Sequence, residues 1–205
     1  MRIATVFLDI GGVLIGLDNE PALKRISEFS RLEVQEFTRR LNENSRIAAY
    51  EAGELTTEEF FEHHCELLEM KITLEEFKEI WSSVFVFDSP ANGMVSPGLF
   101  EELKRNCRLI ALSNTNEMQF TYLVSCHPLV GQFHDQILSY QMGCLKPDPE
   151  IYRLALHKAG CSPSATLFVD DLPENVEAAR RLGIQGVLFE GEEKLRRELK
   201  ILGLL

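Results

Sequence analysis

Four short polar clusters along the chain contain residue types that could do chemistry together. The clusters are Asp9 with Gly11-Gly12, Ser113-Asn114-Thr115, Lys146-Pro147-Asp148-Pro149, and Asp170-Asp171 with Asn175. Each cluster alone is weak evidence, because an Asp before Gly is usually a turn residue and a Lys before Pro is usually solvated. Together they offer carboxylates for a hard cation, and a hydroxyl, an amide and an ammonium group for an anion.

Phosphoryl transfer is a reaction that this set of side chains could carry out. Mg²⁺ prefers oxygen ligands and keeps waters and phosphate oxygens in its shell, while a Lys places a compact positive charge on a phosphate. A carboxylate in line with phosphorus could then act as nucleophile, and water would hydrolyse the resulting aspartyl-phosphate. The sequence lacks a G-x-x-x-x-G-K-[ST] motif, which argues against the ordinary nucleotide-binding loop.

Short apolar runs predict the strands that would position these clusters. Because the runs are continuously apolar, they fit parallel strands that are covered on both faces. The carboxyl ends of such strands meet at one edge of a sheet, where ligands bind. The predicted strands cover residues 2–8, 109–112, 166–169 and 186–189, with another at 137–139.

Helical segments alternate with these strands from about residue 95 to 190, at 97–104, 150–159 and 174–182. This alternation predicts an α/β fold with a doubly wound parallel, Rossmann-like sheet. Residues 17–90 instead show helical periodicity throughout, at 21–29, 33–42, 57–68 and 73–83.

We therefore predict two structural units. The α/β core would comprise residues 1–16 and 91–205, and residues 17–90 would form an inserted all-helical cap. The cap could close over the end of the first strand as a lid, or it could pack rigidly on the sheet as a helical bundle.

Composition limits the classes of function. The chain has 205 residues, of which 45% are hydrophobic, and its formal net charge is −11, so most of its surface should repel nucleic acid and anionic lipid. The five Cys residues include no C-x-x-C pair and are expected to be free thiols. No apolar run is long enough to cross a membrane, and we expect a cytoplasmic protein whose partner is a small molecule.

The four clusters, with their flanking residues, resemble the four motifs of the haloacid dehalogenase superfamily, and the resemblance covers essentially the whole chain. The matching segments are 7–14 (FLDIGGVL), 112–115 (LSNT), 145–149 (LKPDP) and 168–175 (FVDDLPEN). The helical stretch also lies where this family inserts a small cap. The chain looks most similar to the phosphatase branch that includes bacterial sugar-phosphate phosphatases and the phosphatase domain of soluble epoxide hydrolase.

The resemblance implies a role for each motif residue. Asp9 would be the nucleophile and a Mg²⁺ ligand, the Gly11 backbone carbonyl a second ligand, and Asp171 the acidic ligand from the last motif, with Asp170 supporting the metal from beside it. Ser113 and Asn114 would hold phosphate oxygens, and Lys146 would neutralise both the phosphate and Asp9. The implied activity is a Mg²⁺-dependent phosphomonoesterase acting on a small phosphorylated metabolite.

Gly11 departs from the family pattern. Phosphatases that this chain resembles usually carry an Asp two residues after the nucleophile, which protonates the leaving oxygen. Loss of general acid help costs about 10² to 10⁴ in rate, so alkyl phosphates should react more slowly than aryl phosphates. If they do not, another acid must supply the proton. Asp18 is the first candidate, and residues 50–54 lie where the cap could face the site.

Two other classes of function stay open on the sequence. A dehalogenase of the same superfamily would share the nucleophile but work without metal, and the Asp170-Asp171 pair argues against it. A non-catalytic binding or regulatory protein could keep the fold without the proton donor, as Gly11 allows. His63 and His64 are expected to be packing or solvated residues of the cap rather than ligands. Trp81, Phe85 and Phe87 could line a substrate pocket, or they could belong to the core of the cap.

Overall fold

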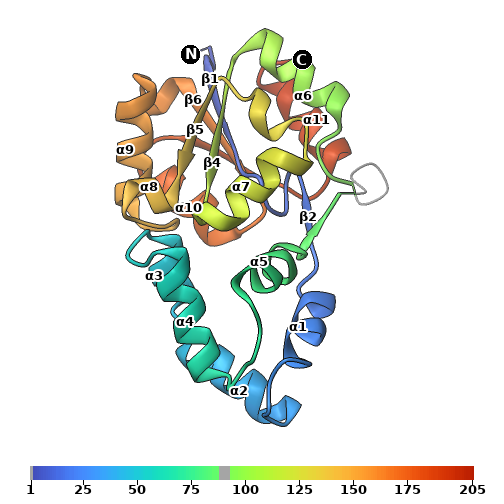
Figure 1. Ribbon diagram of the computed structural model, residues 1–205. Coiled ribbons are helices and arrows are strands. Elements are labelled where there is room, and N and C mark those ends of the chain that lie inside the picture. The colour runs from blue at the N-terminus through green and yellow to red at the C-terminus, as the bar shows by residue number, and fades with distance from the viewer. Residues whose placement is uncertain (1, 88–92) are drawn as a thin grey trace.

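The computed structural model describes residues 2–87 and 93–205, and its centre is a five-stranded parallel sheet (Figure 1). The strand order is β5-β4-β1-β6-β7, so the first strand of the chain lies in the middle. Every neighbouring pair is parallel, which confirms the predicted fold class. The strands are β1 (Thr5–Leu8), β4 (Arg108–Ser113), β5 (Asp135–Leu138), β6 (Thr166–Asp170) and β7 (Gln185–Leu188).

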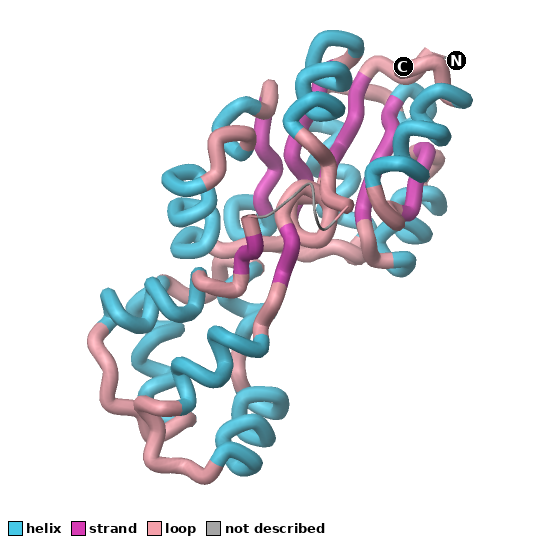
Figure 2. Tube along the Cα trace, turned by 90° about the vertical axis from the view of Figure 1, so that its right-hand side faces the viewer, coloured by secondary structure: helices cyan, strands magenta, loops and turns pink. Residues whose placement is uncertain are grey.

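Helices cover both faces of this sheet (Figure 1, Figure 2). Because side chains alternate along a strand, Val6 and Leu8 of β1 enter one core and Phe7 enters the other. The first core is completed by α6 (Pro97–Asn106), α7 (Glu117–Cys126) and α11 (Glu192–Ile201). The second core is completed by α9 (Pro149–Ala159) and α10 (Pro173–Arg181). Short helical turns, η1 (Val130–Gln132), α8 (Ser139–Met142) and η2 (Pro163–Ala165), connect the larger elements.

In the described residues between β1 and α6, five helices form a separate lobe, which we call the cap (Figure 2). They pack around an aromatic core that includes Phe37, Phe60 and Phe77. Capping boxes, in which an N-cap Thr and a Glu three residues later bond each other's backbone, start α4 and α5. The cap helices are α1 (Glu20–Ser27), α2 (Val34–Asn44), α3 (Ile47–Glu51), α4 (Thr57–Leu67) and α5 (Leu74–Ser82).

The segments that join cap and core differ from the all-helical prediction for residues 17–90. β2 (Gly16–Leu17) and β3 (Phe85–Val86) pair in antiparallel fashion where the chain leaves the core and returns to it. The two crossing segments run side by side, so their backbone groups bond each other. The predicted boundary at residues 90 and 91 lies outside the described residues.

Two further expectations can be compared with the described residues. All five cysteines are free thiols, as expected. Among the helices of residues 2–87 and 93–205, none combines the length and the apolar character that crossing a bilayer requires.

Candidate active site

The carboxyl edge of the sheet brings the predicted residues of three motifs together. Asp9 directly follows β1, Ser113 ends β4 and Asp170 ends β6. The register places β1 and β6 in step, and the Asp9 backbone N–H donates to the Val169 carbonyl at 3.0 Å. Two carboxylates from neighbouring strands therefore lie side by side at one edge, as the apolar runs predicted.

Lys146 joins these two carboxylates from the loop before α9. Its Nζ lies 2.8 Å from Asp9 Oδ2 and 2.7 Å from Asp170 Oδ2, and it donates to the Leu112 carbonyl at 3.0 Å. Only 1% of the Lys146 side chain is exposed, so all three ammonium hydrogens have acceptors in a buried position. This arrangement fixes the charge of Lys146 beside Asp9.

Asp170 is buried, and protein donors surround its carboxylate. Its Oδ1 accepts hydrogen bonds from the Leu172 backbone N–H and from Asn175 Nδ2, each at 2.9 Å, while Oδ2 faces Lys146. Asn175 is itself buried, and its carbonyl accepts a hydrogen bond from the Tyr152 hydroxyl at 2.9 Å. Both oxygens of Asp170 are therefore already engaged by protein donors.

Asp171 completes a group of three carboxylates. One oxygen from each of Asp9, Asp170 and Asp171 lies within 4.8 Å of the others. Asp171 approaches the backbone of Gly12 so closely that a Cβ on that residue would stand 2.2 Å from Asp171 Oδ2. Gly12 has a φ of +72°, which also favours glycine. The Gly11-Gly12 pair thus allows the last motif to approach the first.

The electrostatics of this group favour a cation. Burial raises the pKa of Asp9 to about 7, with Asp170 adding to the rise and Lys146 opposing it. The pKa of Asp171 is also raised, first by burial and then by the charge of Asp170. The two carboxylates beside Lys146 outweigh the effect of its burial and raise its pKa, which keeps the ammonium charged. When all three carboxylates are ionised, they and the one ammonium leave two negative charges, which match a divalent cation.

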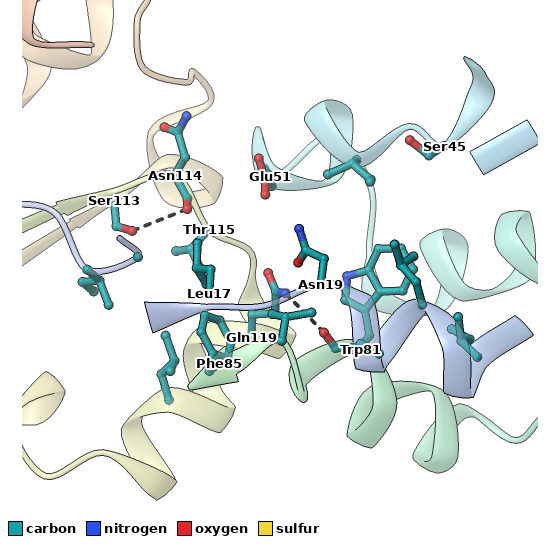
Figure 3. A pocket seen from close by; sticks show the side chains of 18 of the residues that line it. Leu17, Asn19, Ser45, Glu51, Trp81, Phe85, Ser113, Asn114, Thr115 and Gln119 are labelled. Carbon is teal, nitrogen blue, oxygen red and sulfur yellow. Dashed lines mark hydrogen bonds between the residues drawn. The ribbon is translucent and has the colours of Figure 1, made fainter. Parts of the chain in front are cut away.

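Ser113 and Asn114 follow β4 at the same edge. Ser113 is buried, and its hydroxyl donates a long hydrogen bond of 3.4 Å to the Asn114 carbonyl (Figure 3). The Asn114 side chain holds the backbone of Lys146 from both ends, since Oδ1 accepts from the Lys146 N–H at 2.8 Å and Nδ2 donates to its carbonyl at 2.9 Å. Asn114 therefore positions Lys146, and its second amide hydrogen stays available to a ligand.

A cavity of about 490 Å³ lies between this edge and the cap. Figure 3 shows residues of the core, such as Ser113 and Asn114, on one side and residues of the cap, such as Glu51 and Trp81, on the other. A hydrogen bond of 3.4 Å from Gln119 to the Trp81 carbonyl connects the two walls. The polar cavity residues are Asn19, Asn42, Ser45, Glu51, Trp81, Ser113, Asn114, Thr115 and Gln119.

The remaining residues that the sequence analysis named differ in whether they reach the cavity. Of the segment 50–54, Glu51 lines the cavity while Tyr50 is buried in the cap. Asp18 is exposed, and its Oδ1 accepts a hydrogen bond from the Glu20 N–H at 3.1 Å. His64 is buried among the cap aromatics, as expected for a packing residue.

Leu17 is a cavity residue that the sequence did not reveal. A Cβ on Gly11 would stand 3.1 Å from Leu17 Cδ1, so Leu17 covers the backbone two residues after Asp9. No local signal marks this contact, because it depends on how the β2 segment turns back over the first motif.

Comparisons with known proteins now decide the family. A family model described as haloacid dehalogenase-like hydrolase matches residues 3–183. The chain belongs to the haloacid dehalogenase-like hydrolases. This confirms the predicted family and the prediction of a hydrolytic enzyme.

Two relatives that match nearly the whole chain are phosphatases by name. The chain is 27% identical to D-ribitol-5-phosphate phosphatase of Bacteroides thetaiotaomicron over 98% of each chain. It is also 27% identical to phosphatase MT3486 of Mycobacterium tuberculosis, over 99% of this chain and 96% of the relative. Both names support the prediction of a phosphatase.

A solved structure of a family enzyme from Bacteroides thetaiotaomicron, in complex with magnesium and inorganic phosphate, is also similar. It has a TM-score of 0.80 and 26% identity, over 92% of this chain and 95% of that chain. Magnesium, the predicted cofactor, is thus the metal of that complex.

Proposed function

We propose that this hydrolase is a Mg²⁺-dependent phosphomonoesterase that acts on a small phosphorylated metabolite through an aspartyl-phosphate on Asp9. The observation that carries the proposal is the buried Asp9–Lys146–Asp170 arrangement beside Asp171, at the sheet edge where Gly11 and Ser113 line a cavity. It places a carboxylate nucleophile, a fixed positive charge and a set of oxygen ligands at one point.

The three carboxylates fit a magnesium ion by their chemistry and charge. Asp9, the Gly11 carbonyl and Asp171 would hold it, because both oxygens of Asp170 are already engaged by protein donors. Asp170 would support the site through Lys146 and Asn175. When bound, magnesium would supply positive charge that polarises the phosphate oxygens and screens Asp9.

The chain's own residues would then carry the transfer. An Asp9 carboxylate oxygen attacks phosphorus, the bond from phosphorus to the ester oxygen breaks, and water later attacks phosphorus to release Asp9 and inorganic phosphate. Lys146 neutralises the phosphate beside Asp9, and the Ser113 hydroxyl and Asn114 amide bind phosphate oxygens. Buried neighbours hold these groups in place, so little reorganisation is needed.

The cavity favours a polyol or sugar phosphate as substrate class. Its wall combines amide and hydroxyl groups, such as Asn19, Ser45 and Gln119, with the flat face of Trp81. Hydroxyl-rich substrates need such donors and acceptors. The name of the relative that acts on D-ribitol 5-phosphate supports the same class.

We also propose that the chain divides as the sequence predicts, into a core of residues 1–16 and 91–205 and a cap of residues 17–90. The separate aromatic core of α1 to α5 supports this division. A cytoplasmic location likewise stays a prediction.

A panel of phosphorylated metabolites, with 4-nitrophenyl phosphate and acetyl phosphate as reference compounds, tests the proposed activity. We expect phosphate release that requires Mg²⁺ and is abolished in Asp9→Asn. Phosphate release that survives EDTA would contradict the metal dependence. Metal-independent release of halide from a 2-haloacid would indicate the dehalogenase alternative, and no turnover of any compound would indicate a binding protein.

A further inference from the structure

The reaction on the carboxyl edge lacks a proton donor for the leaving oxygen. Gly11 has no side chain, and Leu17 covers it, with Cδ1 3.1 Å from the position of a Cβ. An alkoxide is a poor leaving group, so hydrolysis of an alkyl phosphate needs an acid within hydrogen-bond reach of that oxygen. The donor must therefore come from another wall of the cavity.

Glu51 is the only acidic side chain among the described residues that line this cavity. It comes from the cap and lies across the cavity from Ser113, on the core side (Figure 3). Within residues 2–87 and 93–205 its carboxylate has no hydrogen-bond donor and no cation within ion-pair distance. A carboxyl group in this position can contact a bound substrate.

The cap holds Glu51 in place from both sides. The preceding Tyr50 is buried, its hydroxyl lies 2.7 Å from Thr57 Oγ1, and its ring stacks on Phe60 with centroids 4.2 Å apart. Two residues after Glu51, Gly53 packs against the core, where a Cβ would stand 2.1 Å from the Tyr140 carbonyl oxygen. The end of α3 is thus fixed against α8, with Glu51 over the cavity.

We propose that Glu51 donates the proton to the leaving oxygen, in the role that Gly11 leaves open. This inference rests on the proposed phosphomonoesterase activity. Burial raises the pKa of Glu51, although Lys146 opposes the rise, and a raised pKa favours the protonated form that a general acid needs.

The proposed step balances in atoms and charge. As Asp9 forms its bond to phosphorus, the bond to the ester oxygen breaks and that oxygen takes the proton of the Glu51 carboxyl group, so a neutral alcohol leaves. Water then attacks phosphorus and gives a proton to the Glu51 carboxylate, and the bond between phosphorus and the Asp9 oxygen breaks. Glu51 is thereby reprotonated, and the sum is ester plus water giving alcohol plus phosphate.

Glu51→Gln tests this role with two substrates that differ in their need for a proton. We expect kcat/KM for glycerol 3-phosphate, an alkyl phosphate, to fall by about 10² to 10⁴, and that for 4-nitrophenyl phosphate by less than about tenfold. Glu54→Gln on the same segment and Asp18→Asn are matched controls, and both should behave as wild type. Glu51→Asp, which keeps the acid, should retain more activity on the alkyl substrate than Glu51→Gln.

Three results would overturn the role of Glu51. An equal loss with both substrates would assign Glu51 to binding or packing, and no loss would remove it from the mechanism. Wild-type protein that hydrolyses 4-nitrophenyl phosphate but no alkyl phosphate of the panel would show that no residue donates the proton. Wild-type protein that hydrolyses neither substrate class would instead contradict the proposed function.

Discussion

The two walls of the cavity are built on different principles. On the core side, Lys146 is enclosed by two carboxylates and a carbonyl, and each oxygen of Asp170 has a protein donor. On the cap side, the Glu51 carboxylate lines the cavity with no protein partner among the described residues. The core wall is organised before substrate arrives, whereas the cap wall has polar groups left for the substrate. We infer that chemistry resides in the core and that substrate choice and proton supply reside in the cap.

Removing the charge of Lys146 should produce the largest effect. Lys146→Ala leaves Asp9 and Asp170 buried without their cation, and loss of one partner of a buried ion pair costs about 3 to 5 kcal/mol. Glu51→Gln should change the free energy of unfolding by less than about 0.5 kcal/mol, because it removes no hydrogen bond or ion pair to another described residue. Urea unfolding in EDTA measures both. Equal free energies of unfolding of the two variants would contradict the claim that the core wall is held by buried ion pairs and the cap wall is not.

Mg²⁺ affinity should also depend on the core wall of the cavity and not on the cap wall. Asp171→Ala is expected to weaken Mg²⁺ binding by roughly 10- to 100-fold, because a carboxylate ligand is lost, while Glu51→Gln leaves it unchanged. Titration calorimetry with Mg²⁺ alone measures this effect without turnover. Unchanged affinity in Asp171→Ala would move the direct ligand to Asp170.

The cap should be sensitive to mild acid. His64 is buried, and its Nδ1 lies 2.8 Å from the Phe60 carbonyl. Its Nε2 has no hydrogen-bond partner in the part of the chain that the structure describes. Burial lowers the pKa of His64 to about 4, below its usual 6.5, so the unfolded chain binds the proton first. Stability is then fully present above pH 6.5 and falls as the pH decreases towards 4, by about 3 kcal/mol from this residue.

His64→Phe, which keeps the ring in the aromatic cluster, is the matched variant for this effect. Its free energy of unfolding should change less between pH 7 and pH 4 than that of wild type, by about the same 3 kcal/mol. Identical pH dependence of the two proteins would show that His64 does not contribute.

The smallest expected effect comes from the contact between Gly53 of the cap and the Tyr140 carbonyl of the core. Gly53 and Gly143 have φ values of +74° and +72°, but only at Gly53 would a Cβ meet another residue, the Tyr140 carbonyl. Gly53→Ala should therefore raise KM for alkyl phosphates several-fold, whereas Gly143→Ala should show only the backbone cost of about 1 kcal/mol in stability. Similar KM values for the two variants would mean that this contact does not position Glu51.

The core wall was largely predictable from the sequence, and the cap wall was not. Apolar runs ending in Asp9, Ser113 and Asp170 predicted a parallel sheet, and parallel strands necessarily bring their carboxyl ends to one edge. The approach of Leu17 to Gly11 and of Gly53 to Tyr140 depends on contacts between distant segments, which leave no periodic signal in the sequence.

Even within a predicted motif, the contacts of Asn114 could not be predicted from the sequence. Its residue type and position predicted phosphate binding, which stays a prediction, but not that its amide also holds the backbone of Lys146, 32 residues further along the chain. The role of a polar side chain depends on which partners the fold brings to it. The antiparallel pairing of residues 16–17 with 85–86 was missed for a related reason, because two-residue strands are too short to show alternation.

Rapid acid quenching of the wild-type protein during turnover of 4-nitrophenyl phosphate with Mg²⁺ tests most directly that the chemistry resides on Asp9. Mass spectrometry of the quenched protein should find one phosphoryl group, on the peptide that contains Asp9, and none in Asp9→Asn. Glu51→Gln should form the same adduct from this substrate, because its leaving group needs no proton. A phosphoryl group on any other residue, or turnover by Asp9→Asn at the wild-type rate, would contradict the account.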